Sequence, residues 1–210
     1  MNAWTALAFL LAGAWILWRS IRFPVPAAHP ELLAFGLIVA ANAPGSFAYH
    51  GFGGAVALWV HDVAALGIPL FVAVHDLGLL RGWAVPVRLR WSVGCLVAGG
   101  LVLGVVPAAS VTLAGLATIA AAAGEFLALR GGFRPRIGPP WTAWEVTWLL
   151  VAATLVLGSV AFVLGRTGSP LCNPVGWFQL HAAWHLLSAA ASAAFAFAGL
   201  EHGLVRERDG

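Results

Sequence analysis

The amino-acid sequence predicts an all-α integral membrane protein, folded as one bundle of seven transmembrane helices. Of its 210 residues, 61% are apolar and only 9% are charged, and the mean hydropathy is +0.90. A water-soluble domain carries about 25% charged residues, so this composition excludes that class. The chain also divides into seven apolar stretches, and one helical crossing of a bilayer takes roughly 20 apolar residues.

The seven stretches lie within a single domain covering residues 1–210. Their approximate bounds are 3–18, 31–50, 53–80, 91–107, 109–129, 141–165 and 177–200. Each is expected to be helical, because lipid cannot satisfy bare backbone groups. Pro44-Gly45, and Gly67 with Pro69, are expected to mark kinks or close helix contacts rather than breaks.

The arginines predict the orientation of this bundle. With seven spans, one side of the membrane receives Arg166 alone. The other side receives Arg19, Arg22, Arg81, Arg88, Arg90, Arg130, Arg134, Arg136, Arg206 and Arg208. The positive-inside rule therefore predicts an N-terminus outside and a C-terminus in the cytoplasm. We expect a multi-pass cell-membrane protein, and a composition rich in Ala, Gly and Arg without lysine indicates a bacterial inner membrane.

Two further predictions follow from charge and topology. Arginines spread over five places form no basic patch, so no nucleic-acid partner is expected. Cys95 is predicted near the inner end of its span and Cys172 in an outer loop. About 30 Å of bilayer separates those positions, so the two cysteines are expected to remain free thiols.

Five polar residues are predicted at one depth inside the spans. A central Asp costs roughly 2.5–3.5 kcal/mol to insert, so such residues are functional candidates. At 1.5 Å per helical residue, all five fall in the outer half of the membrane. They are Ser46, His50, Asp62, His181 and His185. In contrast, Glu31, His75 and Asp76 are expected at the membrane interfaces, as solvated helix ends.

The spacing of these residues is typical of a catalytic zinc site. His181 and His185 are four residues apart and share a helix face, as do Ser46 and His50. Three histidines leave the fourth position of tetrahedral zinc open for water. Asp62 is predicted to move protons and Ser46 to stabilise an oxyanion.

Several polar residues have alternative interpretations. A single HxxxH motif is weak evidence for a metal, and a Ser inside a span usually bonds to nearby backbone. His61 is expected to point about 100° away from Asp62, as a partner or a packing residue. Two acids near the inner helix ends are expected to pair with arginines there. These predicted partners are Glu125 and Glu145 with Arg130 and Arg136.

The motifs resemble the alkaline ceramidase family, within a superfamily of seven-helix membrane hydrolases that includes the adiponectin and progestin receptors. The resemblance rests on Ser46-Phe-Ala-Tyr-His50, on Asp62, and on Gln179-Leu-His181-Ala-Ala-Trp184-His185. It implies zinc held by the three histidines, with Ser46 and Asp62 as catalytic helpers. It further implies a membrane lipid amide as substrate, hydrolysed to a fatty acid and an amine. No acid precedes Glu31, so the calcium site of the eukaryotic members is not expected.

Two other functions remain open at the level of sequence. A bis-histidine haem protein needs only two of the histidines and leaves Ser46 and Asp62 without a role. A receptor or transport protein of the same fold can hold a metal without catalysing a reaction. We expect the lipid amide hydrolase, because five polar residues at one depth serve a single reaction.

Overall fold

The computed structural model describes residues 2–22, 29–131, 133–135, 141–165, 169, 171–172, 176, 179–201 and 204–206. Its long helices are α2 (Leu7–Arg22), α3 (His29–Phe52), α4 (Ala55–Arg81), α5 (Val85–Val105), α6 (Ser110–Arg130), α7 (Trp141–Gly165) and α8 (Leu180–Phe195). Its short elements are α1 (Asn2–Thr5), the 3₁₀ turn η1 (Pro107–Ala109), the π-helical turn η2 (Ala196–Glu201), and strands β1 (Phe133–Pro135) and β2 (Leu204–Arg206). The two strands form an antiparallel pair.

Six of the described helical segments are long and apolar enough to cross a membrane. They are Ala3–Arg22, Pro30–Phe52, Ala55–Arg81, Val85–Val105, Pro107–Arg130 and Leu180–Leu200. This finding confirms a multi-pass helical membrane protein. The predicted stretch 141–165 coincides with α7, in which Val151–Gly165 forms a shorter apolar helix. The count of seven spans and the orientation stay predictions, and Arg166, which entered the charge count, lies outside the described residues.

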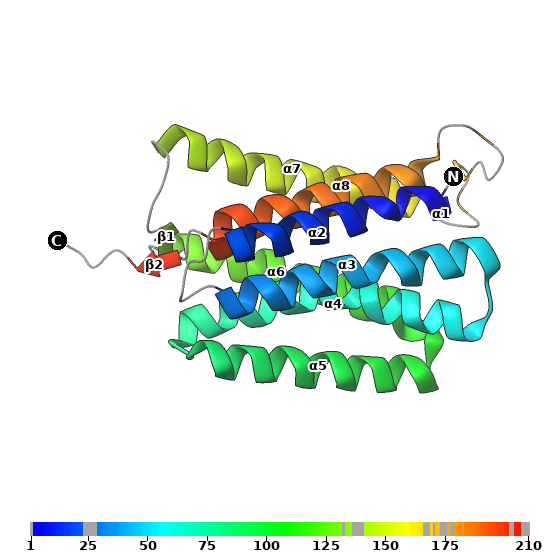
Figure 1. The fold of residues 1–210 in the computed structure, drawn as a ribbon, viewed down its shortest axis with the longest axis horizontal. Helices are drawn as coiled ribbons and strands as arrows, with labels where there is room; N and C mark the ends of the chain where they lie inside the picture. The colour runs from blue at the N-terminus through cyan, green and yellow to red at the C-terminus, as the bar shows by residue number, and fades with distance from the viewer. Residues whose placement is uncertain are drawn as a thin grey trace.

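The helices lie side by side along the long dimension of the molecule (Figure 1). Helix α3 packs between α2 and α4, and α4 also contacts α5 and α6. Helix α8 packs against α2 and α7, so the last long helix returns to the first ones. The α1 end of the bundle and the β1–β2 pair lie at opposite ends (Figure 1).

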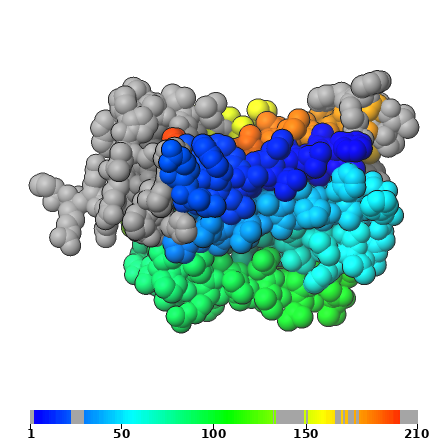
Figure 2. All heavy atoms as spheres, in the orientation of Figure 1, coloured from blue at the N-terminus to red at the C-terminus, as the bar shows by residue number. Residues whose placement is uncertain are grey.

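The core of the bundle is apolar and lies between α2, α3, α4 and α8. Phe35 of α3 is central, because its ring centroid lies 5.1 Å from that of Phe71 and 5.3 Å from that of Phe195. Large apolar side chains also cover the outside, as Leu11 (70% exposed) and Leu101 (68%) illustrate. Figure 2 shows one outer face of the molecule, on which α2, α3, α4 and α5 lie side by side. Apolar residues on both the inside and the outside are what a lipid environment requires.

A tight connection between α3 and α4 positions the residues of the candidate site. Gly53 and Gly54 link the two helices with φ angles of 71° and 92°, a region that favours glycine. Eight residues earlier, a Cβ added to Gly45 would lie 3.2 Å from the Cα of His61. The absence of a side chain at Gly45 therefore lets the α3 backbone approach α4 next to His61. Both helices continue through their prolines, Pro44 and Pro69, as predicted.

Candidate metal centre

Three histidines from two helices meet near one end of the bundle. His50 comes from the last turn of α3, and His181 and His185 come from the first turns of α8. The His50 ring centroid lies 4.8 Å from that of His181 and 5.4 Å from that of His185, while those of His181 and His185 are 4.9 Å apart. His185 is 1% exposed and His181 is 8% exposed. The predicted three-histidine cluster therefore forms in the fold, largely shielded from solvent.

The donor atoms of this cluster have the spacing that a metal ion requires. One nitrogen from each ring can be chosen so that all three lie within 4.8 Å of one another. Nε2 of His50 and Nε2 of His181 are 3.2 Å apart. Zn–N bonds of 2.0–2.1 Å in a tetrahedron place two ligand nitrogens about 3.4 Å apart. The three imidazoles are therefore able to hold a zinc ion without a large rearrangement.

Two hydroxyl groups contact His185, one on each ring nitrogen. Oγ1 of Thr5 lies 3.0 Å from Nδ1, and Oγ of Ser46 lies 3.2 Å from Nε2. When Nδ1–H donates to Thr5, Nε2 keeps its lone pair for a metal, an arrangement common among metal-ligating histidines. Ser46, which is 3% exposed, then borders the position of the metal.

The structure places His61 beside the histidine cluster and pairs it with Asp62, which is one of the two roles expected of it. Its ring centroid lies 5.4 Å from that of His50 and 5.1 Å from that of Tyr49. Nδ1 of His61 also lies 2.8 Å from Oδ1 of Asp62. Among the described residues, no hydrogen bond joins Asp62 directly to Ser46 or to the three histidines. Asp62 is therefore linked to the cluster through His61.

Aromatic rings complete the surroundings of the cluster. The Phe9 ring centroid lies 5.7 Å from that of His185, and the Phe162 ring centroid lies 6.0 Å from that of His181. Sequence reasoning missed Phe9, Phe162 and Thr5. None of the three has a partner nearby in the chain that would have singled it out.

Three polar residues predicted as solvated helix ends are instead buried in the opposite half of the bundle. Glu31 is 3% exposed, His75 4% and Asp76 0%. Glu31 accepts hydrogen bonds from Nε of Arg88 at 2.7 Å, from a terminal guanidinium nitrogen of Arg88 at 2.6 Å, and from Nδ1 of His75 at 3.0 Å. One carboxylate therefore ties α3, α4 and α5 together.

The predicted pairing of Glu125 with Arg130 is wrong. Both carboxyl oxygens of Glu125 are buried without a hydrogen-bond partner in the described part of the chain. The guanidinium of Arg130 instead lies 5.1 Å from the Phe126 ring centroid. The side chain of Glu145 and the whole of Arg136 lie outside the described residues. Cys95 and Cys172 are both free, as predicted.

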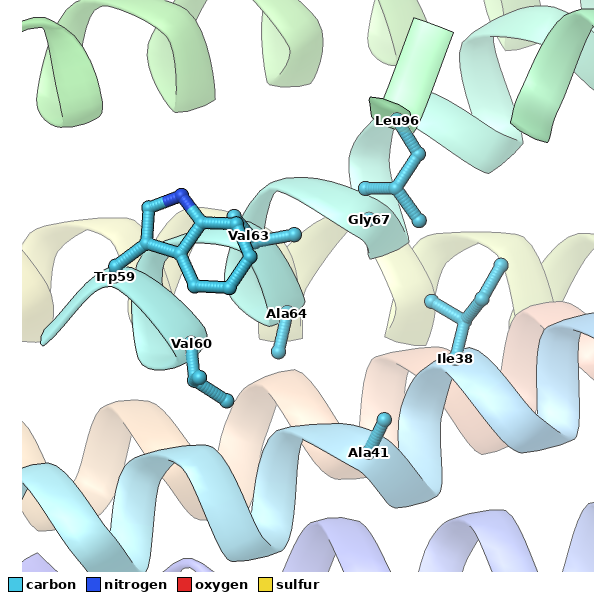
Figure 3. A pocket seen from close by; sticks show the side chains of 8 residues that line it. All are labelled: Ile38, Ala41, Trp59, Val60, Val63, Ala64, Gly67 and Leu96. Carbon is cyan, nitrogen blue, oxygen red and sulfur yellow. The ribbon is translucent and has the colours of Figure 1, made fainter. Parts of the chain in front are cut away.

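An apolar cavity of about 210 Å³ lies between α3, α4 and α5 (Figure 3). Its lining residues are Ile38, Ala41, Trp59, Val60, Val63, Ala64, Gly67 and Leu96. The indole nitrogen of Trp59 donates to the carbonyl oxygen of Gly100 at 2.8 Å, so it is already satisfied. Val60, which lines the cavity, directly precedes His61 along α4.

No family model, curated protein or solved structure matches the chain.

Proposed function

We propose that the protein is a membrane-embedded, zinc-dependent hydrolase of lipid amides. The observation that carries the proposal is the three-histidine cluster, in which Ser46 and Thr5 contact the same imidazole. A bis-histidine haem site needs only two of the three imidazoles and gives Ser46 no role. The resemblance of the Ser46–His50 and His181–His185 motifs to the alkaline ceramidases supports the same reaction class.

Zinc, when bound by His50, His181 and His185, would supply the Lewis acidity that activates water and polarises a carbonyl group. The protein's own residues supply the remaining functions. Thr5 fixes the ring orientation of His185. Ser46 offers a hydroxyl that can donate to the oxyanion as the carbonyl carbon becomes tetrahedral.

Proton transfer falls to Asp62 in this proposal. Its carboxylate is held by His61 at 2.8 Å, and His61 lies beside His50. The pair accepts a proton from the attacking water and returns one to the amine as it leaves. The apolar cavity of Figure 3 accepts the acyl chain, because it offers carbon atoms and no free polar group.

We also propose that α7 is a seventh span, with the N-terminus outside and the C-terminus in the cytoplasm of a bacterial inner membrane. The positions of α1 and the β1–β2 pair at opposite ends of the bundle support an odd number of crossings (Figure 1). Six candidate spans together with α7 meet this condition.

The experiment is a lipid-hydrolysis screen on purified protein reconstituted in lipid, with wild type beside Asp62→Asn. We expect wild type to release fatty acid from at least one N-acyl lipid, with about one zinc per chain. Asp62→Asn should retain the zinc and lose roughly 10²–10⁴-fold in rate. Zinc-free protein that is fully active would overturn the proposal. A Soret band in the absorption spectrum would favour haem, and zinc without turnover on any lipid would favour a receptor.

A further inference from the structure

A second polar site lies on the side of α4 that packs against α6, away from the histidine cluster. Asp76 of α4 is 0% exposed, and its carboxyl group interacts electrostatically with that of Glu125 of α6. All four carboxyl oxygens are buried, and none has a hydrogen-bond partner in the described part of the chain. Asp76 follows Asp62 by 14 residues, which is about 21 Å along the helix. The proposed hydrolase chemistry uses neither Asp76 nor Glu125.

The glycine next to Glu125 brings the two helices together at this point. A Cβ added to Gly124 would lie 2.8 Å from the Cβ of Asp76 and 3.0 Å from its Oδ2. Gly124 thus lets α6 approach until the buried Asp76 carboxyl lies against the α6 backbone at Gly124, directly before Glu125 in the chain. Asp76 and Glu125 each lie five residues before the arginine that ends their helix, or about 7.5 Å from it.

No basic side chain in the described structure neutralises this pair. The guanidinium of Arg88 is engaged by Glu31 and by the carbonyl oxygen of Trp83. That of Arg130 lies over Phe126. Two neighbouring carboxylates without a counter-charge are costly inside a membrane bundle. Either a bound cation or bound protons therefore offset the charge of the two acids.

We propose that Asp76 and Glu125 bind one hard divalent cation between α4 and α6. Two carboxylates and one divalent ion sum to zero charge, so a single ion offsets the cost of burying both acids. Donors that are all oxygen select ions of the Mg²⁺, Mn²⁺ and Ca²⁺ class rather than the metals that imidazole prefers. Magnesium-sized ions are commonly held by one or two carboxylates, with water completing the coordination.

The test uses Mn²⁺ alone as the probe, added to the zinc-loaded full chain and followed by electron paramagnetic resonance. We expect wild type to bind about one Mn²⁺, and Asp76→Asn and Glu125→Gln each to lose this binding. His185→Ala, which removes a zinc ligand, should still bind Mn²⁺ at this second site. Excess Mg²⁺ should displace the Mn²⁺.

Thermal unfolding with and without Mn²⁺ is a second measurement, which shows whether each variant is folded and whether the ion binds to it. Mn²⁺ should raise the unfolding temperature of wild type, because a ligand that binds only the native state stabilises it, and should not raise that of Asp76→Asn. Folded Asp76→Asn that binds Mn²⁺ as wild type does would overturn the proposal. A second result would also overturn it: wild type binds no Mn²⁺, and its infrared spectrum shows a protonated carboxyl group that is missing from Asp76→Asn. Protons, rather than a cation, would then neutralise Asp76 and Glu125.

Discussion

Thr5 and His185 are separated by 180 positions in the chain, yet Oγ1 of Thr5 lies 3.0 Å from Nδ1 of His185. This contact places the start of the first membrane helix against the side of α8 that carries the histidine cluster. A partner on the second ring nitrogen fixes both the tautomer and the orientation of a ligating histidine, and losing it typically costs 10- to 100-fold in metal affinity.

Replacing Thr5 with Val should therefore weaken zinc binding about 10- to 100-fold, because the side chain keeps its shape but loses the acceptor for Nδ1–H. Competition with a zinc chelator measures the effect. Thr5→Ser retains the hydroxyl and should bind zinc nearly as wild type does. Equal zinc affinity of Thr5→Val and wild type would mean that the hydroxyl has no part in orienting the ring.

His185→Ala should abolish stoichiometric zinc binding, since it removes the most buried of the three ligands. Elemental analysis of the purified protein measures this loss. Ser192→Ala on the same helix is the matched control, because the Ser192 hydroxyl donates only to the carbonyl oxygen of Ser188 in its own helix, at 2.8 Å. Ser192→Ala should keep its zinc, and a similar loss in both variants would point to damage of α8 rather than of the site.

Glu31→Gln should destabilise the bundle by about 3–5 kcal/mol, because it leaves the buried guanidinium of Arg88 without its counter-charge. Unfolding in detergent, followed by tryptophan fluorescence, measures the difference. The double variant Glu31→Leu with Arg88→Met removes both charges and should recover most of the loss. If Glu31→Gln unfolds together with wild type, the ion pair contributes nothing to stability.

Gly13→Ala should destabilise the contact between α2 and α3 by about 1–3 kcal/mol. The new Cβ would lie 2.6 Å from the backbone nitrogen of Ala40, and a backbone atom cannot move aside cheaply. Gly115→Ala is the control, because no atom lies within 4 Å of its added Cβ. That control should be neutral or slightly stabilising, since alanine is the better helix former. Equal stability of the two variants would contradict the close approach of α2 to α3.

Ala64→Phe should shorten the acyl chains that the enzyme accepts, because the ring fills the cavity of Figure 3. Rates on lipid amides of increasing chain length measure the effect. We expect long-chain substrates to lose most of their rate while short-chain substrates keep theirs. Ala123→Phe adds the same ring on an exposed position of α6 and should leave the chain-length profile unchanged. A profile unchanged in Ala64→Phe would place the acyl chain elsewhere.

The helical bundle could be predicted from the sequence, because long apolar runs in lipid have few alternatives to helix. The clustering of the three histidines could also be predicted, since the i, i+4 spacing of His181 and His185 fixes a shared face and the depth of His50 matches theirs. The structure brings these three rings together, as expected. Both successes rest on local periodicity and on position along a helix.

Other features could not be predicted, because distance from a helix end gives depth but not which face is buried. Glu31 and Asp76 lie near helix ends, and the bundle interior buries them completely. His61 was assigned by its angle from Asp62, but angle alone ignores the reach of a side chain and the position of the neighbouring helix. Contacts such as Thr5 with His185 join distant segments, and no local pattern marks them.

The distribution of the three clustered histidines between α3 and α8 has a consequence for biosynthesis. His50 is translated among the early helices, whereas His181 and His185 follow every other long helix of the bundle. A growing chain therefore holds one ligand in the membrane for most of its synthesis and acquires the other two together, at the end. Partly made or truncated chains would sit in the lipid without the complete histidine cluster, so the proposed hydrolase could act only after the final helix has docked.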